Sequence, residues 1–314
     1  MAQNNSNLHT AKNEKNDEFY TQLSDIENEL KHYKEFFKGK IVYCNCDDAR
    51  ESSFFKYFSM NFEHLGLKKL ITTGYKADGR GVCLVYEGDK NGNKIVDDYE
   101  IKVTELEGNG SFETTECIEF LKEADIVVTN PPFSLFRAYV KQLMDYGKKF
   151  LILGNNNAIT YKEIFSYIKN NQLWLGFSVN KTMEFELSDS YEKWDRIDEN
   201  GKKYGKVPAI TWFTNIEHNK RNIELDLYKK YNPTDYPKYD NYDAINVGKV
   251  SEIPIDYDGI MGVPITFLGK YCPNQFEILY LCASHGKVVK NIPNEAPCIN
   301  GKWVYARILV KKLS

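Results

Sequence analysis

The stretch Ala124-Asp125-Ile126-Val127-Val128-Thr129-Asn130-Pro131-Pro132-Phe133 decides the fold. Its run of apolar and β-branched residues predicts a buried central strand, which the two prolines end. Proline fixes its own φ and keeps the preceding residue extended, so Asn130 is expected at the carboxyl end of that strand. Ligands bind at this edge of open α/β sheets, and we therefore expect a functional site there.

Asn130 and its neighbours suit chemistry on an exocyclic amine. Such an amine, on a nucleobase or on glutamine, is planar and a poor nucleophile, because its lone pair is delocalised. The side-chain oxygen of Asn130 and the carbonyl of Pro131 are both able to accept its hydrogens, which frees the lone pair for attack. Phe133 offers a flat face on which a base can stack. The alternative is that Asn-Pro-Pro only ends a strand and starts a helix.

The Asn130–Phe133 tetrapeptide resembles the catalytic motif of the amino-group DNA methyltransferases that use S-adenosylmethionine. The likeness is greatest to the EcoRI-type adenine-specific methyltransferases and covers nearly the whole chain. It is carried by Asp17–Gln22, Tyr43–Asp48, Asp125–Phe136, Tyr236–Val247 and Gly259–Leu268, and it is weakest at 74–110, 177–207 and 281–302. The resemblance implies catalytic roles for Asn130, Pro131, Pro132 and Phe133.

The same resemblance implies a set of residues that bind S-adenosylmethionine. These are Phe19, Tyr20 and Thr21 over its methionine end; Asn45, Cys46, Asp47 and Asp48 after the first strand; Ser111 and Phe112 at its adenine; and Asn130. The loop after the first strand lacks the usual glycines, a departure that the family shares. Ser111 stands where the family has an acidic residue, and no acidic residue directly follows the second strand to hold the ribose.

Other roles are open for several of these residues. Asp47 and Asp48 are also suited to capping the helix that follows them. Cys44 and Cys46 are more typical of packing than of ligand binding. Asn155–Asn157 is expected either to line the base pocket or to form a polar turn.

Helical and strand patterns alternate along the chain. Helices are expected at Ser24–Gly39, with Ser24 and Glu27 as a capping box, at Glu51–His64, at Glu113–Glu123, between Phe133 and Tyr146, and at Tyr161–Asn170. Strands are expected at Lys40–Cys44, Lys68–Thr73, Lys149–Leu153, Gln172–Gly176 and Val207–Thr214, with a hairpin in 79–103. This alternation predicts an α/β fold, a class I methyltransferase-like (Rossmann-like) twisted, mostly parallel sheet with helices on both faces.

We expect three regions along the chain. Residues 1–16 are polar and predict a flexible arm, and 17–230 form the cofactor-binding catalytic domain, with 177–207 as a recognition insertion. Residues 231–314 are expected to recognise DNA, because Tyr236–Tyr242 mixes aromatic, amide and basic side chains. The alternative for this last region is an irregular cap over the sheet without a DNA role.

Composition narrows the class of protein. The net charge of the 314 residues is −3, but residues 201–314 carry 16 Lys and Arg against 11 Asp and Glu. This basic carboxyl-terminal third of the chain is suited to binding DNA phosphates. The alternative is that its charges are simply part of a solvated surface. The seven cysteines include no Cys-x-x-Cys pair, which favours free thiols in a reducing compartment. No membrane span, signal peptide or metal-ligand cluster is evident, so a cytoplasmic protein is expected.

The resemblance thus implies methyl transfer from S-adenosylmethionine to N6 of an adenine in duplex DNA, which must be flipped out of the helix to react. The resemblance also implies a palindromic, AT-centred site, with GAATTC as the leading candidate, and a cognate restriction endonuclease that acts on the same site without direct contact. The enzyme is expected to be a monomer. Guanine readers are expected among Arg196, Lys202, Lys203, Lys206 and Lys238. The alternatives are a methyltransferase acting on RNA or protein glutamine, and a non-catalytic DNA-binding module.

Overall fold

The computed structural model describes residues 20–45, 48–179, 181–187, 194–207, 209–283 and 295–313. The chain divides into two units, each with its own internal contacts. Unit 1 comprises Met1–Ala158 and Gly176–Ile216, and unit 2 comprises Ile159–Leu175 and Glu217–Ser314.

The large sheet of unit 1 contains the expected buried strands. Its strands follow the order β5-β4-β3-β2-β6-β7-β12. Their bounds are β2 Ile41–Cys44, β3 Lys69–Gly74, β4 Val82–Tyr86, β5 Ile101–Glu105, β6 Ile126–Thr129, β7 Lys149–Asn155 and β12 Ile210–Thr214. Neighbours among β3, β2, β6 and β7 are parallel, whereas β4, β5 and β12 are antiparallel to their neighbours. The predicted α/β class, with a mostly parallel sheet, is confirmed.

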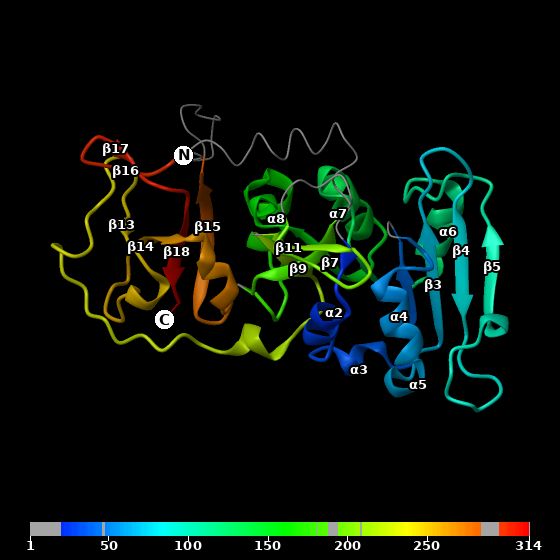
Figure 1. The fold of residues 1–314 in the computed structure, drawn as a ribbon. Coiled ribbons are helices and arrows are strands. Elements are labelled where there is room, and N and C mark those ends of the chain that lie inside the picture. Colours follow the sequence, from blue (N-terminus) through cyan, green and yellow to red (C-terminus); the bar gives the residue numbers. More distant parts are fainter. Residues whose placement is uncertain are drawn as a thin grey trace. The chain divides into compact units, whose positions relative to one another are not determined.

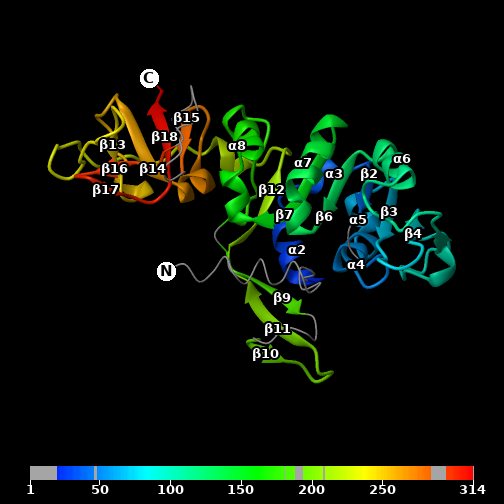
Figure 2. The same ribbon diagram turned by 90° about the horizontal axis from the view of Figure 1, so that it is seen from above.

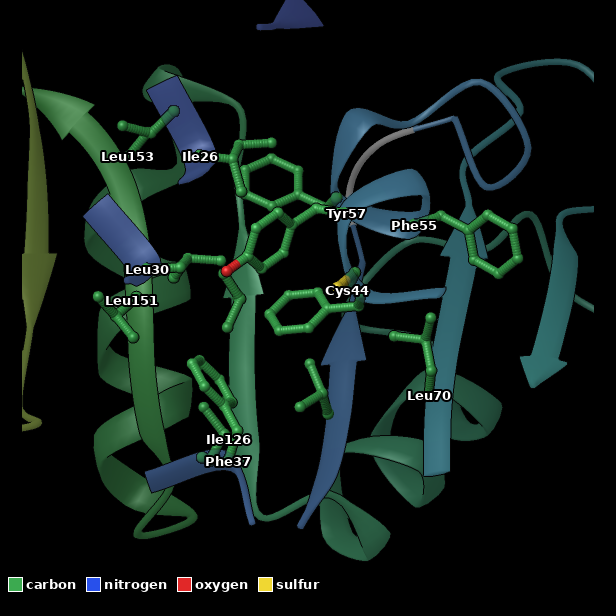
Figure 3. Packing of buried hydrophobic residues seen from close by; sticks show 14 of the residues in the cluster. Ile26, Leu30, Phe37, Cys44, Phe55, Tyr57, Leu70, Ile126, Leu151 and Leu153 are labelled. Atoms are coloured by element: carbon green, nitrogen blue, oxygen red, sulfur yellow. The ribbon is translucent and has the colours of Figure 1, made fainter. Parts of the chain in front are cut away.

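Helices cover both faces of this sheet (Figure 1). They are α2 Leu23–Leu30, α3 Lys34–Phe37, α4 Ser53–Met60, α5 Phe62–Leu65, α6 Thr115–Glu123 and α7 Phe136–Asp145. Helices α2 and α4 lie on one face, and α6 and α7 on the other. Figure 3 shows Ile26 and Leu30 of α2 and Tyr57 of α4 facing Ile126 and Leu151 of the sheet, in one buried cluster. Burial of each such apolar side chain contributes roughly 1.5–3 kcal/mol to the free energy of folding. This packing holds in place the strands whose ends form the candidate site.

The first predicted helix differs from the structure in two ways. It is broken into α2 and α3, because Tyr33 leaves the helical conformation, at φ −125°, and its hydroxyl donates to Glu29 at 2.8 Å. The predicted capping box of Ser24 and Glu27 is wrong. The N-cap is Gln22, which makes no side-chain cap, because the chain leaves strand β1 (Tyr20–Thr21) and turns directly into the helix.

A smaller antiparallel sheet, also in unit 1, has the order β1-β9-β11-β10. Its further strands are β9 Met183–Leu187, β10 Arg196–Ile197 and β11 Lys203–Val207, all from the region predicted as a recognition insertion. Figure 2 shows these three strands standing away from the large sheet. Strand β1 brings the segment before α2 into the same sheet.

Unit 2 contains a sheet of order β13-β14-β18-β15. The helices and strands of unit 2 are α8 Lys162–Lys169, β8 Trp174–Leu175, β13 Ile245–Asn246, β14 Ile260–Pro264, β15 Phe276–Cys282, β16 Cys298–Ile299, β17 Lys302–Trp303 and β18 Arg307–Lys312.

Short 3₁₀ helices occur in both units. They are η1 Asp98–Glu100, η2 Phe133–Leu135, η3 Asn156–Thr160, η4 Asn219–Asn222, η5 Val250–Glu252 and η6 Ile265–Lys270. Among the described residues, no helix has the length and apolar character needed to cross a membrane.

Candidate active site

Strands β2 and β6 place two candidate segments at one edge of the large sheet. The strands are parallel neighbours, with Tyr43 opposite Val127, so their carboxyl ends meet. The hydroxyl of Thr129 donates a hydrogen bond to the backbone carbonyl of Asn45. The loop that begins at Asn45 is therefore tied to the residue that directly precedes Asn130.

The motif itself turns from strand to helix at this edge. The side-chain oxygen Oδ1 of Asn130 is buried, and Pro131 after it is buried as well. Pro132 precedes η2, and Phe133, half-buried, packs its ring against the large core cluster. A buried amide oxygen is a stronger acceptor than one in water, because the local dielectric constant is low. The geometry thus suits an acceptor for an amine, next to an aromatic face.

Tyr139 of α7 joins two of the predicted cofactor-binding residues. Its hydroxyl donates to Oδ1 of Asn45, and both side chains are buried. Its ring meets Phe112 edge to face, with ring centroids 5.1 Å apart and planes at 85°. One turn further along α7, Nε2 of Gln142 donates to the carbonyl of Phe112 at 3.0 Å. Asn45 and Phe112, which are far apart in sequence, are therefore held by the helix that follows the motif.

Sequence reasoning did not find Tyr139 and Gln142. Both lie on the helix directly after the motif, three residues apart, so they share one helical face. That spacing was visible in the sequence, but only the folded sheet shows that this face meets Phe112.

Glycines bring the Ser111–Phe112 loop close to the end of β3. Gly110 has φ +80°, and a Cβ there would lie 2.3 Å from the carbonyl oxygen of Gly74. A Cβ on Gly81 would likewise lie 2.7 Å from the Cα of Gly110. A side chain at either position would meet backbone that is unable to move aside, so this close approach requires glycine. These glycines were not among the predicted site residues.

Ser111 has a local structural role. Its hydroxyl accepts from the backbone N–H of Glu113 at 3.5 Å, and its carbonyl accepts from the hydroxyl of Thr114 at 2.9 Å. Thr114 in turn caps α6. The predicted contact of Ser111 with a cofactor stays a prediction, whereas its place in the turn before α6 is plain.

Asp48 is exposed and closes a turn. Its Oδ1 accepts from the backbone N–H groups of Arg50 and Glu51, each at 2.9 Å. Ser52, and not Asp48, is the N-cap of α4. The predicted cofactor-binding residues Phe19, Cys46 and Asp47 lie outside the described residues.

Two residues of unit 1 carry a buried side-chain atom that is suited to a polar ligand. Two buried polar atoms, Oγ1 of Thr21 and Oε1 of Gln142, have no hydrogen-bond partner within the described part of the chain. Buried polar atoms are normally paired, so these two suggest a polar ligand that supplies the missing partners. No group of His, Cys, Asp or Glu able to hold a metal occurs in the described ranges.

The predicted guanine readers are mostly engaged by neighbouring side chains. Arg196 forms a two-point ion pair with Glu184, at 2.5 and 3.2 Å, and Lys202 pairs with Glu186 at 2.8 Å. Lys203 lies over the ring of Trp194, with its ammonium 4.5 Å from the ring centre. The remaining candidates are Lys206 on β11 and Lys238 in unit 2, which pairs with Asp243 at 3.6 Å.

Parallel central strands, helices on both faces and candidate ligands at the strand ends define a class I methyltransferase-like protein. Comparison with known families agrees. The sequence model described as "Adenine-specific methyltransferase EcoRI" matches residues 7–313. The chain belongs to this family, and the predicted enzyme class, an adenine-specific DNA methyltransferase, is confirmed.

Curated relatives cover nearly the whole chain. The type II methyltransferase M.EcoRI of Escherichia coli is 49% identical over 99% of this chain and 98% of its own length. The type II methyltransferases M.MpnI of Mycoplasma pneumoniae and M.MgeORF184P of Mycoplasma genitalium are 41% and 40% identical, each over 96% of this chain and 97% of their own length. The similarity therefore includes both units.

Proposed function

We propose that the protein transfers a methyl group from S-adenosylmethionine to N6 of adenine within a specific site of duplex DNA. The observation that carries this proposal is the buried Oδ1 of Asn130, at a strand end tied through Thr129 to the Asn45 loop. Methyl transfer at this edge of the sheet needs a hydrogen-bond acceptor beside a bound cofactor. The Asn130 motif supplies the acceptor, and the loop that begins at Asn45 is the candidate cofactor segment beside it.

S-adenosylmethionine supplies an electrophilic methyl group when bound. Thr21, Asn45, Phe112 and Gln142 are the described residues that we assign to holding it. Tyr139 orients two of them, since it contacts both Asn45 and Phe112.

The reaction is carried by the motif. Oδ1 of Asn130 and the carbonyl of Pro131 would accept the two hydrogens of the adenine amine, which frees its lone pair for attack. The ring of Phe133 stacks on the base and holds it in place. The amine proton leaves after the methyl group has been transferred, so no strong base is required. The half-buried position of Phe133 leaves part of the ring available for this contact.

The target adenine lies inside a duplex and must be flipped out to reach Asn130. We propose GAATTC as the site, protected in this way from a restriction endonuclease that acts on the same sequence without direct contact. A cytoplasmic, monomeric enzyme remains our prediction.

The product of the reaction tests the proposal. The protein is incubated with duplex DNA and methyl-labelled S-adenosylmethionine, and the DNA is then digested to nucleosides and separated. We expect the label in N6-methyldeoxyadenosine. Label in methylcytosine, or transfer to RNA or protein glutamine in parallel reactions with DNA left unlabelled, would contradict the proposal.

A further inference from the structure

The connection between strands β4 and β5 is a long polar loop whose chemistry the proposed function does not use. It comprises residues 87–100, which include five Asp and Glu against two Lys. From residue 89 to residue 100 its sequence is Asp-Lys-Asn-Gly-Asn-Lys-Ile-Val-Asp-Asp-Tyr-Glu. The loop lies at the edge of the large sheet (Figure 1), because β5 is the last strand in the sheet order. Residues 90–95 are exposed, so a small solute is able to reach the loop.

The spacing of the polar residues is that of a calcium-binding loop of the EF-hand type. Such loops have ligands at the first, third, fifth, seventh, ninth and twelfth positions. The seventh ligand is a backbone carbonyl, and the twelfth is a carboxylate that binds through both oxygens. Counted from the first carboxylate, these positions are occupied by Asp89, Asn91, Asn93, Ile95, Asp97 and Glu100. The chain therefore offers an oxygen at every ligand position of the pattern.

Lys94 departs from this pattern. EF-hand loops have a glycine at the sixth position, where the chain turns sharply. The backbone of Lys94 has φ +62°, which is the left-handed conformation that glycine adopts most easily. The loop thus has the required bend. The lysine places a positive charge on the same loop as the ligands, which weakens the binding of a cation.

The polar side chains of the loop converge on one another. Nδ2 of Asn91 and Nδ2 of Asn93 both donate to Oδ2 of Asp97, at 2.9 and 2.8 Å. Oδ1 of Asn91 accepts from the backbone N–H of Asn93 at 2.8 Å. Oδ2 of Asp89 accepts from the backbone N–H of Lys94 at 2.7 Å. Amide and carboxylate oxygens each have more than one lone pair, so they are able to bind a cation in addition to these hydrogens.

Glu100 supplies an independent observation that points to a cation. It is 4% exposed, and its carboxylate accepts from the backbone N–H groups of Lys90, at 2.7 Å, and Asp97, at 3.4 Å. Both donors belong to the loop, so the carboxylate points into it. Within the described part of the chain, no lysine, arginine or histidine forms an ion pair with Glu100, and Lys90 pairs with Glu87 at 4.0 Å. Buried charges are normally paired or bind a metal, so this carboxylate indicates a cation site.

We propose that residues 89–100 bind one calcium ion. Calcium accepts carboxylate, amide and backbone carbonyl oxygens in a flexible geometry, and this loop offers all three kinds. The carboxylates alone do not form a metal-binding group in the described ranges, so the site depends on the oxygens of Asn91, Asn93 and Ile95 as well. The inference does not rest on the proposed function, because the loop contains none of the residues assigned to the cofactor or to the adenine.

The composition of the loop also predicts its affinity and selectivity. It combines three carboxylates with neutral oxygens and has Lys94 at the bend, so we expect a weak site of this type, with a Kd for calcium of about 10⁻⁴–10⁻³ M. Magnesium requires a nearly ideal octahedral geometry and gives up its water reluctantly, so it should bind more weakly than calcium.

Calorimetric titration tests the site. The full chain is freed of divalent cations with a chelator, and Ca²⁺ is titrated into it, with Mg²⁺ in a parallel titration. Glu100→Gln keeps the shape of the side chain and removes its charge, so calcium affinity should fall at least about 10-fold, because affinity follows the charge of the ligands. The matched control is Asp98→Asn, which removes the same charge from an exposed residue of the loop that is not at a ligand position and should bind calcium as the wild type does.

A second variant serves if Glu100→Gln does not fold. Asp97→Asn removes the charge of another ligand and keeps an oxygen at that position, so it should weaken calcium binding as well. Thermal unfolding without calcium shows whether each variant is folded. In the wild-type protein, calcium should raise the Tm and slow amide exchange in residues 87–100, because it binds the folded loop.

Three results would overturn the proposal. They are no saturable binding up to about 10 mM Ca²⁺, equal calcium affinities in the folded ligand variants and in Asp98→Asn, and tighter binding of Mg²⁺ than of Ca²⁺. Calcium that binds but leaves amide exchange in residues 87–100 unchanged would place the ion elsewhere and overturn the proposal too. DNA methylation is measured separately, and its outcome does not bear on this site.

Discussion

Tyr139 shows how much of the candidate site depends on one side chain. It is fully buried, donates to Asn45 and packs against Phe112, although it belongs to neither the motif nor the predicted cofactor set. Both contacts are with residues that we assign to holding the cofactor, so we expect Tyr139 to act by positioning them.

We predict that Tyr139→Phe weakens cofactor binding more than it slows the chemical step. The change leaves Oδ1 of Asn45 buried without its donor, which costs about 1–3 kcal/mol. The KM for S-adenosylmethionine should therefore rise between several-fold and about 100-fold, with kcat changed little. The control is Tyr146→Phe at the end of the same helix, where the tyrosine is 39% exposed. Equal kinetic effects of the two changes would argue against the assigned role.

Phe133 is the residue that we expect to stack on the flipped adenine. Phe133→Ala should weaken base capture by about 1–3 kcal/mol, whereas Phe133→Trp should retain it. A fluorescent adenine analogue at the target position reports the capture. Because Phe133 also packs on the core, thermal unfolding is measured in parallel. Leu135→Ala, an exposed change in the same 3₁₀ helix, is the control, and an unaltered fluorescence signal in Phe133→Ala would rule out stacking.

At the scale of elements, the strands were predictable and the helix ends were not. Strands β2, β6 and β7 are continuous apolar runs, and such runs are buried in any fold that forms a parallel sheet. The start of α2 and its break before α3 depend instead on β1 and on the Tyr33–Glu29 contact, which join residues through tertiary structure. Local periodicity carries no information on either.

The N-terminal ends of helices α4 and α2 give a direct prediction. The hydroxyl of Ser52 accepts from the N–H of Phe54 at 3.2 Å and caps α4, so Ser52→Ala should lower the free energy of unfolding by about 0.5–2 kcal/mol. Ser24 has the sequence pattern of a cap but lies exposed inside α2, so Ser24→Ala should leave stability nearly unchanged. Urea unfolding of both variants measures the difference. A larger loss for Ser24→Ala would show that the observed helix start is wrong.

The candidate site was also predictable only in part, because local sequence patterns reveal some of its residues and tertiary contacts bring in the others. Proline chemistry and strand burial place Asn130 at a sheet edge, and the resemblance supplied Asn45 and Phe112. The partners Tyr139 and Gln142 and the close approach of Gly74 and Gly110 arise only when distant segments meet, so sequence pattern alone did not identify them.

At the scale of the whole molecule, the proposal that remains to be tested is the DNA sequence that the enzyme recognises. Similarity to M.EcoRI extends over 99% of this chain, and our proposal of GAATTC rests on the resemblance to the EcoRI-type enzymes. The region 177–207 is one of three in which the resemblance is weakest, and it forms β9, β10 and β11. We therefore expect a change of the outer base pairs to originate there. A wrong base pair typically costs about 1–3 kcal/mol.

We predict that saturating methylation by this protein protects plasmid DNA from EcoRI endonuclease. Digestion by an endonuclease with an unrelated site serves as the control for intact DNA. If EcoRI endonuclease still cuts the methylated plasmid, the GAATTC assignment is wrong, although adenine methylation at another site would survive that result.

The central claim is that the buried Oδ1 of Asn130 activates the adenine amine. The most direct measurement is the single-turnover rate of methyl transfer by Asn130→Ala on pre-bound duplex, together with its affinity for S-adenosylhomocysteine. Loss of a preorganised stabilising group typically lowers such a rate by about 10²–10³-fold, so we predict a loss of that size with the fold and much of the cofactor affinity retained. A variant that transfers methyl groups at the wild-type rate would contradict the account.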